Sequence, residues 1–411
     1  MKNTGGLPNI ILIVCDTLGA KHMSLYGYGR KTTPGLERLV EEEGFTLYGN
    51  CWSTSCWTSP AHASLFTGLY PSEHGTHEEC IVLSEHLMTL PEILSMAGYR
   101  TVGISSNGLV SEFSGYARCF DWFIGLDRYH PFRMGREVMD AVGSKGSLAG
   151  KAGELIRLTA RGGDYCLPFK YGVNLAWSRL VEKYHFHSAL GNAAPYTQKA
   201  LRTAREFLAG AEGPLFLFIN LMQTHNNYRP PAATRGTWSD CHSPFRRDCQ
   251  EPVDHYKKSP YAEGKLAYFR DLYDEEVLYL DGVLCDFYEQ VKRDGDIFAV
   301  TSDHGENFGE DGHFGHMVSL TTAVCKVPLL IRYPGQAKPE FSGQLCQIND
   351  LFSTFGELAG SPVPPPESSV PLVSSRPRRS ALMEIVRPER WLKTLRDREK
   401  YDLCFKKEVF L

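Results

Sequence analysis

The sequence predicts an α/β protein built on one doubly wound, mostly parallel central sheet with helices on both faces. Three observations support this fold class. Apolar segments of strand length alternate with helical segments, the first strand candidate is apolar at nearly every position, and polar residues follow directly after several strand candidates. In an open parallel sheet such residues gather at one edge, where ligands bind.

The first strand is expected at residues 8–15, because a continuous apolar run bounded by turn residues is typical of a central strand covered on both faces. A short helix is expected after Trp57, since Pro60 suits a first helical turn. The remaining elements are expected as helices at 33–43, 87–97 and 261–292, and as strands at 46–52, 100–105, 214–221, 297–301 and 327–333.

The main domain is expected to cover residues 1–360. Within it, residues 129–195 have a helical pattern with glycine-rich breaks and no obvious strand, which predicts a helical insertion or lid. Residues 361–411 are expected to form a proline- and serine-rich linker followed by a short, charged C-terminal segment, so the C-terminal region is abbreviated.

The composition narrows the partners. A net charge of −4 gives no sign of nucleic-acid binding or of a polybasic membrane patch. The apolar run at 9–15 is too short to span a bilayer, so no membrane span is expected. The sequence shows no signal-peptide pattern, and its twelve cysteines are scattered and not paired at short spacing. Both observations favour reduced thiols and a cytoplasmic location. The sequence leaves the oligomeric state open.

Three predicted strand ends carry polar residues. Asp16 follows the first strand, His225 follows the strand at 214–221, and Asp303 and His304 follow the strand at 297–301. Asp16 alone has a simpler interpretation as a turn former. Together with a hydroxyl oxygen, the carboxylates and imidazole favour a site for one divalent cation such as Mn²⁺, Mg²⁺, Ca²⁺ or Zn²⁺.

Thr58 is expected at a helix N-terminus, where free backbone N–H groups favour an anion. It could serve only as a helix cap. In contact with a metal, its hydroxyl could instead become a nucleophile. His225 and His316 could bind an anionic oxygen or protonate a leaving alkoxide, a role suited to imidazole.

Several segments together resemble the sulfatase family of the alkaline phosphatase superfamily, over about residues 8 to 360. They are residues 9–17, Tyr26-Gly27-Tyr28, Thr32-Thr33-Pro34, SPAHASLFTGLYPSEHG at 59–75, Ser105-Ser106-Asn107, residues 218–231, Thr301-Ser302-Asp303-His304-Gly305-Glu306 and Val327-Pro328. The resemblance implies an alkaline phosphatase-like fold and a hydrolase acting on sulfuric or phosphoric ester bonds.

In that family the nucleophile is a cysteine or serine, converted to formylglycine, within the pattern Cys-x-Pro-Ser-Arg. Alignment on Pro60 places Thr58 at the nucleophile and His62 at the arginine. Cys56 lacks a proline two residues on, so no formylglycine is expected there. A threonine nucleophile instead resembles the superfamily's phosphodiesterases and phospho-group transferases.

The resemblance implies a metal set of Asp16, Thr58, Asp303 and His304. It places His62, Asn107, His225 and His316 among the substrate-binding residues, and Thr58, His225 and His316 among the catalytic ones. One metal is expected. A second would need further ligands, for which His225 and His316 are candidates, whereas Gln223 stands where many relatives have aspartate.

The predicted function is therefore metal-dependent hydrolysis of small anionic phosphate or sulfate esters, with Thr58 as the nucleophile. Two alternatives remain at this point. One is a phospho-group transferase, and the other is a catalytically idle relative that binds an anion in the same pocket.

Overall fold

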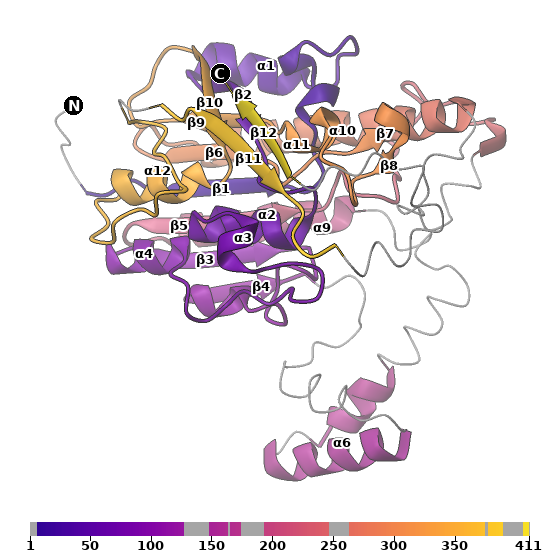
Figure 1. The fold of residues 1–411 in the computed structure, drawn as a ribbon, viewed down its shortest axis with the longest axis vertical. Coiled ribbons are helices and arrows are strands. Elements are labelled where there is room, and N and C mark those ends of the chain that lie inside the picture. Colours follow the sequence, from indigo (N-terminus) through magenta and orange to yellow (C-terminus); the bar gives the residue numbers. More distant parts are fainter. Residues whose placement is uncertain are drawn as a thin grey trace.

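An eight-stranded sheet forms the centre of the protein in the computed structural model (Figure 1). The structure describes residues 6–126, 148–162, 165–173, 193–245, 263–374, 377–388 and 406–410. The strand order is β10-β2-β9-β6-β1-β5-β3-β4. These strands are β1 (Ile10–Cys15), β2 (Thr46–Trp52), β3 (Arg100–Ser105), β4 (Trp122–Gly125), β5 (Leu215–Leu221), β6 (Ile297–Thr301), β9 (Leu329–Arg332) and β10 (Glu340–Gln347).

Every neighbouring pair in this sheet is parallel except those of β9, which runs antiparallel to β2 and β6. β1 lies at the centre, paired with β6 on one side and β5 on the other. All six of its residues are buried, as expected for a strand covered on both faces. The predicted fold class is confirmed.

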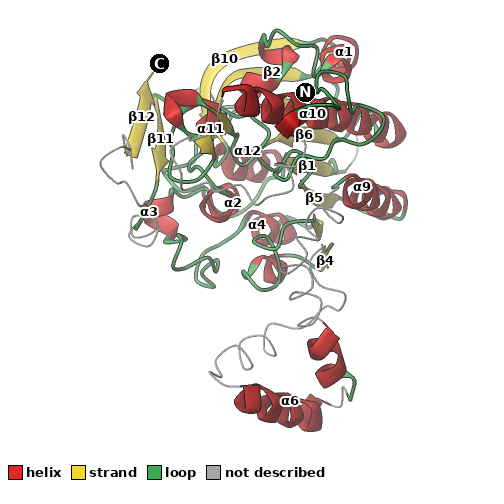
Figure 2. Ribbon diagram, turned by 90° about the vertical axis from the view of Figure 1, so that its right-hand side faces the viewer, coloured by secondary structure: helices red, strands yellow, loops and turns green. Residues whose placement is uncertain are grey.

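Helices cover both faces of the sheet (Figure 2). Alternate residues of β1 point to opposite faces: Ile11 and Ile13 pack with α1 (Pro34–Glu43), α9 (Ala194–Ala209) and α10 (Glu263–Val291). Ile10 and Leu12 pack with α2 (Thr58–Thr67), α4 (Leu90–Met96) and α12 (Asp350–Leu358). Helix α2 thus begins at Thr58 and presents its buried residues to the second face.

Short elements complete the described fold. They are the 3₁₀ turns η1 (Ala20–His22), η2 (Ser24–Tyr26), η3 (Tyr116–Cys119) and η5 (Glu310–Gly312), the helices α3 (Pro71–His74) and α11 (Thr322–Cys325), and the strands β7 (Asn307–Phe308) and β8 (Phe314–Gly315). Strands β11 (Ser380–Glu384) and β12 (Lys406–Phe410) form a separate antiparallel pair.

The predicted insertion at 129–195 falls largely outside the described residues. Its described parts contain α6 (Leu148–Gly162) and a further helical stretch at 167–173. Leu155 of α6 and Leu167 form a small apolar cluster of their own. None of the helices in the described part of the chain is long and apolar enough to cross a membrane.

The proline-rich stretch after Gly360 has no regular structure in its described part, yet it is packed against the domain. Ser369 is buried and its hydroxyl donates to the backbone oxygen of Asn349 at 2.7 Å. Arg378 is only 7% exposed. The prediction of a linker therefore missed its close packing, because the contacts are polar and join residues far apart in the sequence.

Candidate active site

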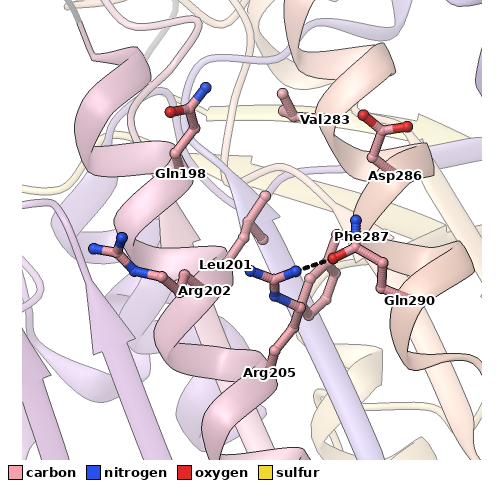
Figure 3. Close-up of a pocket in the computed structure, with 8 residues that line it drawn as sticks. All are labelled: Gln198, Leu201, Arg202, Arg205, Val283, Asp286, Phe287 and Gln290. Atoms are coloured by element: carbon pink, nitrogen blue, oxygen red, sulfur yellow. Dashed lines mark hydrogen bonds between the residues drawn. The ribbon is translucent and has the colours of Figure 1, made fainter.

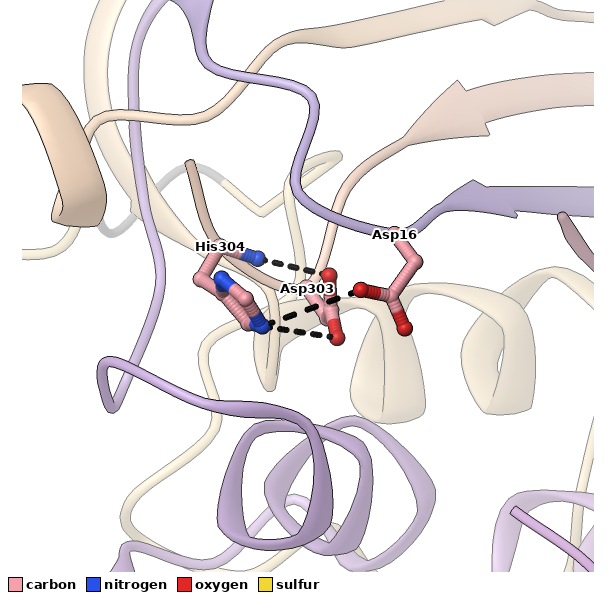
Figure 4. A group of neighbouring side chains, drawn as sticks. All are labelled: Asp16, Asp303 and His304. Carbon is pink, nitrogen blue, oxygen red and sulfur yellow. Dashed lines mark hydrogen bonds and ion pairs between the residues drawn. The ribbon is translucent and has the colours of Figure 1, made fainter. Parts of the chain in front are cut away.

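Asp16, Asp303 and His304 come together at one edge of the sheet (Figure 4). Asp16 follows β1, and the other two residues follow β6, the parallel neighbour of β1. Parallel neighbours end at the same edge, so the three side chains meet. The Nε2 atom of His304 lies 3.4 Å from Asp303 Oδ2 and 3.9 Å from Asp16 Oδ1. All three residues are fully buried.

Three atoms of this cluster lack a hydrogen-bond partner although they are buried: Asp16 Oδ1, Asp303 Oδ2 and His304 Nε2. His304 Nδ1 lies 3.0 Å from the backbone oxygen of Gly305, so it carries the proton and leaves a lone pair on Nε2. Buried polar groups normally have partners. Two carboxylate oxygens and one imidazole nitrogen within 4.8 Å of one another fit a divalent cation.

The electrostatics of the cluster also favour a cation. Burial, and then the charge of Asp303, raises the pKa of Asp16 to about 8. Burial raises the pKa of Asp303 to about 7, against the hydrogen bonds that this carboxyl accepts. The groups that donate to the two carboxylates are amides and a hydroxyl, and the His62 ring beside Asp303 is neutral. A bound cation would therefore compensate two otherwise unbalanced buried charges.

Thr58 lies beside this cluster as the first residue of α2. Its hydroxyl is 3.4 Å from Asp16 Oδ2, at the long end of hydrogen-bond distance, and it also helps to lower the pKa of Asp303. The N-cap residue of α2 is Trp57, and Thr58 is the first residue inside the helix. The Thr58 hydroxyl therefore lies at the candidate metal ligands and not in the capping position.

Backbone and amide donors fix the two carboxylates. Asn107, which follows β3, donates from Nδ2 to Asp16 Oδ2 at 2.6 Å. The backbone N–H of Thr17 donates to Asp303 Oδ1 at 3.2 Å, as does that of His304 at 2.8 Å. Thr17 has a φ of 61°, an uncommon value for a β-branched residue. Asn107, which was predicted to bind substrate, therefore bonds directly to the candidate metal ligand Asp16.

His62 supports the site from inside the core. Its Nδ1 atom lies 3.0 Å from the backbone oxygen of Thr58 and 3.5 Å from Asp303 Oδ2, while Nε2 lies 3.2 Å from the side-chain amide of Asn220. The residue is fully buried, and burial lowers the pKa of the ring to about 3. This neutral ring can orient Thr58, whereas contact with a substrate would require exposure.

His316 and His225 lie next to the ligand cluster. The ring centre of His316 is 4.4 Å from that of His304 and 5.5 Å from that of His225. Burial lowers the pKa of His316 well below its ordinary value, so the ring is neutral. The structure therefore brings both predicted histidines to the site, His225 being the more exposed of the two.

Glu306 orients His316, a contact that the sequence analysis missed. Glu306 is buried, and its Oε1 lies 3.0 Å from His316 Nδ1 while Oε2 accepts from the Tyr228 hydroxyl at 2.9 Å. A carboxylate at Nδ1 fixes the imidazole tautomer and directs the other nitrogen away. The position of Glu306 two residues after His304 was the available signal.

Gln223 points away from the candidate metal ligands. Its side chain accepts from the hydroxyl of Thr197 at 2.9 Å and donates to Glu276 on α10. Burial raises the pKa of Glu276 to about 8. The two side chains tie the β5 end to α9 and α10, so this position has a structural contact where many relatives were expected to have a ligand.

Cys56 lies in a different environment from Thr58. It is fully buried in an apolar cluster that includes Trp57, Val318 and Met383. Burial raises the pKa of its thiol to about 11. All ten cysteines in the described part of the chain are free.

A separate cavity of about 310 Å³ lies between α9 and α10 (Figure 3). Gln198, Leu201 and Arg205 line it from α9, and Asp286 and Gln290 line it from α10. Arg205 bonds to Gln290 across it. It contains none of the predicted site residues.

A family model described as Sulfatase matches residues 8–361. Among characterised relatives, an N-acetylglucosamine-6-O-sulfatase of Bacteroides thetaiotaomicron is 23% identical over 87% of this chain and 68% of its own length. The multifunctional alkaline phosphatase superfamily protein PehA of Trinickia caryophylli is also 23% identical, over 87% of this chain and 74% of its own.

Solved structures share the fold. The phosphonate monoester hydrolase of Agrobacterium radiobacter superposes with a TM-score of 0.61 at 16% identity, covering 98% of this chain and 87% of its own. The C-terminal periplasmic domain of EcEptC from Escherichia coli, solved in complex with Zn, gives 0.53 at 18% identity, covering 88% of this chain and 84% of its own. Their similarity confirms the alkaline phosphatase-like architecture.

Proposed function

Because this chain belongs to the sulfatase family, we propose that it is a metal-dependent hydrolase of sulfuric or phosphoric esters in which Thr58 is the nucleophile. The observation that carries the proposal is the ligand cluster: three buried, unpartnered atoms of Asp16, Asp303 and His304 beside the Thr58 hydroxyl. Relatives named as sulfatases and as a phosphonate monoester hydrolase support both ester classes.

The reaction follows from these positions. A divalent cation bound by Asp16, Asp303, His304 and Thr58 would lower the pKa of the Thr58 hydroxyl and neutralise charge on the ester. The Thr58 hydroxyl gives its proton to solvent, and its oxygen forms a bond to sulfur or phosphorus while the bond to the leaving-group oxygen breaks. His225, the more exposed of the two histidines, protonates the leaving oxygen. Water then hydrolyses the ester formed on Thr58 and restores its hydroxyl.

The charge balance of the site favours substrates with a single negative charge. Two carboxylates would already compensate a divalent cation. A second negative charge on the substrate would therefore add repulsion that no further cation offsets. Sulfate monoesters, phosphodiesters and phosphonate monoesters carry one, whereas phosphate monoesters carry nearly two at neutral pH. The first three classes are the proposed substrates.

Metal analysis and turnover of matched aryl esters test this function. The purified protein should bind about one divalent ion and hydrolyse an aryl sulfate, a bis-aryl phosphate or an aryl phosphonate faster than the aryl phosphate. Thr58→Ala should lose about 10³-fold or more in kcat. Thr67→Ala is a matched control, because Thr67 is a buried threonine of the same helix that bonds to its own turn.

Acid-quenched protein should carry the sulfuryl or phosphoryl group on the peptide that contains Thr58, as shown by mass spectrometry. Absence of bound metal together with unchanged turnover in Thr58→Ala would overturn the proposal. Cys56 found as formylglycine would move the nucleophile away from Thr58.

A further inference from the structure

The loop that carries Thr58 is clamped by a strand from the other end of the sequence. Residues 53–57, here called the nucleophile loop, join β2 to α2 and are buried throughout. The backbone N–H of Glu384, at the end of β11, donates to the backbone oxygen of Thr54 at 2.9 Å. The Ser55 hydroxyl donates to the backbone oxygen of Glu384 at 2.8 Å. β11 therefore bonds directly to the loop.

Gln347 bridges the same two segments. This buried side chain stands at the end of β10, and its amide nitrogen donates to the backbone oxygens of Ser53 at 3.3 Å and Leu382 at 2.9 Å. Its side-chain oxygen accepts from the backbone N–H of Leu382 at 3.0 Å. One amide thus bonds to β11 as a neighbouring strand would, and to the loop as well.

Arg378 fixes the entrance to β11. It is buried, and it forms a two-bond ion pair with Asp350, which is also buried. The guanidinium also donates to the backbone oxygens of Ser368 at 2.7 Å and Ser380 at 3.3 Å. Asp350 in turn accepts from the backbone N–H of Gln347 at 2.9 Å. Ion pair, amide and strand form one connected set of bonds.

Apolar packing supports the same contact. Ala381 and Met383 of β11 belong to one buried cluster with Cys56 and Trp57 of the nucleophile loop. The β11–β12 pair lies at the side of the molecule, above α3 (Figure 2). The loop is therefore fixed on one side by β11 and leads on the other directly into α2.

We propose that Arg378 is a positioning residue for Thr58: through Asp350, Gln347 and β11 it fixes the nucleophile loop, and with it the distance between the Thr58 hydroxyl and the metal ligands. This inference rests on the proposed function of Thr58. A misplacement of about 1 Å in a reacting group can cost roughly 10²-fold in rate. The Thr58 hydroxyl already lies 3.4 Å from Asp16 Oδ2, so a small movement of the loop would take it out of hydrogen-bond distance.

Hydrogen exchange and kinetics of Arg378→Met test the proposal in the full chain. The exchange rate of the peptide covering residues 53–58 should rise at least tenfold. Under metal saturation, kcat per folded protein should fall about tenfold or more while KM stays within about twofold, and Arg378→Lys should recover part of kcat. Unchanged exchange of this peptide in the folded variant would overturn the proposal.

Arg332→Met is the matched control. Arg332 is also a buried arginine, with an ion pair to Asp294 and a bond to the backbone oxygen of Glu43. It lies at the other end of the strands from the candidate site, where β9 pairs with the start of β6. It should leave loop exchange and kcat unchanged. An equal effect of both variants would show general destabilisation and overturn the proposal.

Ser55→Ala keeps the test available if Arg378→Met does not fold. It deletes only the hydroxyl bond to Glu384, so exchange of the loop should rise at least threefold, and an unchanged rate would again contradict the proposal. Hydrogen exchange of the loop can be measured whether or not the protein is catalytically active. If Thr58→Ala proves fully active, the proposed function fails, yet the exchange result still decides whether Arg378 fixes the loop.

Discussion

Two buried clusters of this protein each place aspartate beside histidine, and they differ in the partners that the carboxylates have. In the first, Asp274 of α10 uses both carboxylate oxygens within the protein. Oδ1 lies 2.8 Å from His22 Nδ1, and Oδ2 accepts from the Tyr28 hydroxyl at 2.7 Å and from Arg30 at 2.8 Å. This cluster joins the segment after β1 to α10.

In the second cluster, formed by Asp16, Asp303 and His304, three atoms remain without a hydrogen-bond partner. Both clusters pair carboxylate with imidazole in the interior, so residue type does not separate them. The difference is that Asp274 has an arginine partner in Arg30, whereas in the described part of the chain neither Asp16 nor Asp303 is paired with an arginine or a lysine. A buried carboxylate whose charge the protein leaves uncompensated marks a place for a ligand.

Among the variants that test this comparison, Asp303→Asn should have the largest effect. Loss of one ligand oxygen and one charge is expected to weaken divalent-metal binding by about 10³-fold, more than loss of an outer contact does. The metal-free variant should be at least as stable as the parent, because one of two repelling buried charges is gone. Calorimetric titration and thermal unfolding check both. Asp311→Asn, at an exposed nearby position, is the control, and unchanged metal affinity in Asp303→Asn would contradict the assignment.

The stability of the metal-free protein should fall as the pH rises. Burial raises the pKa of Asp16 to about 8 and of Asp303 to about 7, so between the ordinary value of 3.8 and these values the folded protein retains protons that the unfolded chain has lost. For one such proton, the free energy of unfolding falls by about 3 kcal/mol as the pH rises from 5 to 7. Saturating metal should remove this slope. A metal-free melting temperature that rises over this range would argue against the unbalanced pair.

Asp274→Asn should have the opposite effects to Asp303→Asn. It leaves Tyr28 without its charged partner and Arg30 with Asp271 alone, and it is expected to cost about 2 kcal/mol of stability, with Arg30 partly solvated. Metal affinity and kcat should stay within about twofold of the parent. Denaturant unfolding and metal titration on the same samples measure this. A loss of metal affinity equal to that of Asp303→Asn would erase the distinction between the clusters.

Glu306→Gln should give the smallest effect. The amide preserves the shape of the side chain but weakens the orientation of His316, so kcat/KM should fall about tenfold while metal affinity is unchanged. Tyr228→Phe removes the other contact of Glu306 and should lower kcat/KM by less. If both variants match the parent in steady-state kinetics, the Glu306 contact has no part in turnover.

The central strands were predictable because their physical cause is local. β1, β5 and β6 are largely apolar runs of strand length, and the structure places them within about two residues of their predicted bounds. β4 and β10 were missed. Both lie at the edges of the sheet. β4 has only four residues and none of them is fully buried, whereas the exposed first half of β10 is interrupted by polar residues and glycine.

The site could be predicted where its residues follow strands. Asp16, Asn107, Asp303 and His304 meet because parallel strands bring their ends together, a property that sequence order already contains. Arg378 could not be predicted, since Tyr70 and Asp350 lie far from it in the sequence and no periodicity marks them. Long-range polar contacts of this kind depend on the completed fold.

The contact between Ser55 and Glu384 also determines when, during synthesis of the chain, the nucleophile loop can form its final bonds. The two residues are 329 positions apart, so the loop that carries Thr58 cannot take its final bonds until the ribosome has added that length of chain. At about 5–20 residues per second, this takes on the order of tens of seconds. The candidate metal ligands Asp303 and His304 are also synthesised within this interval. A nascent chain shorter than this therefore has the threonine but not the arrangement that would make it reactive.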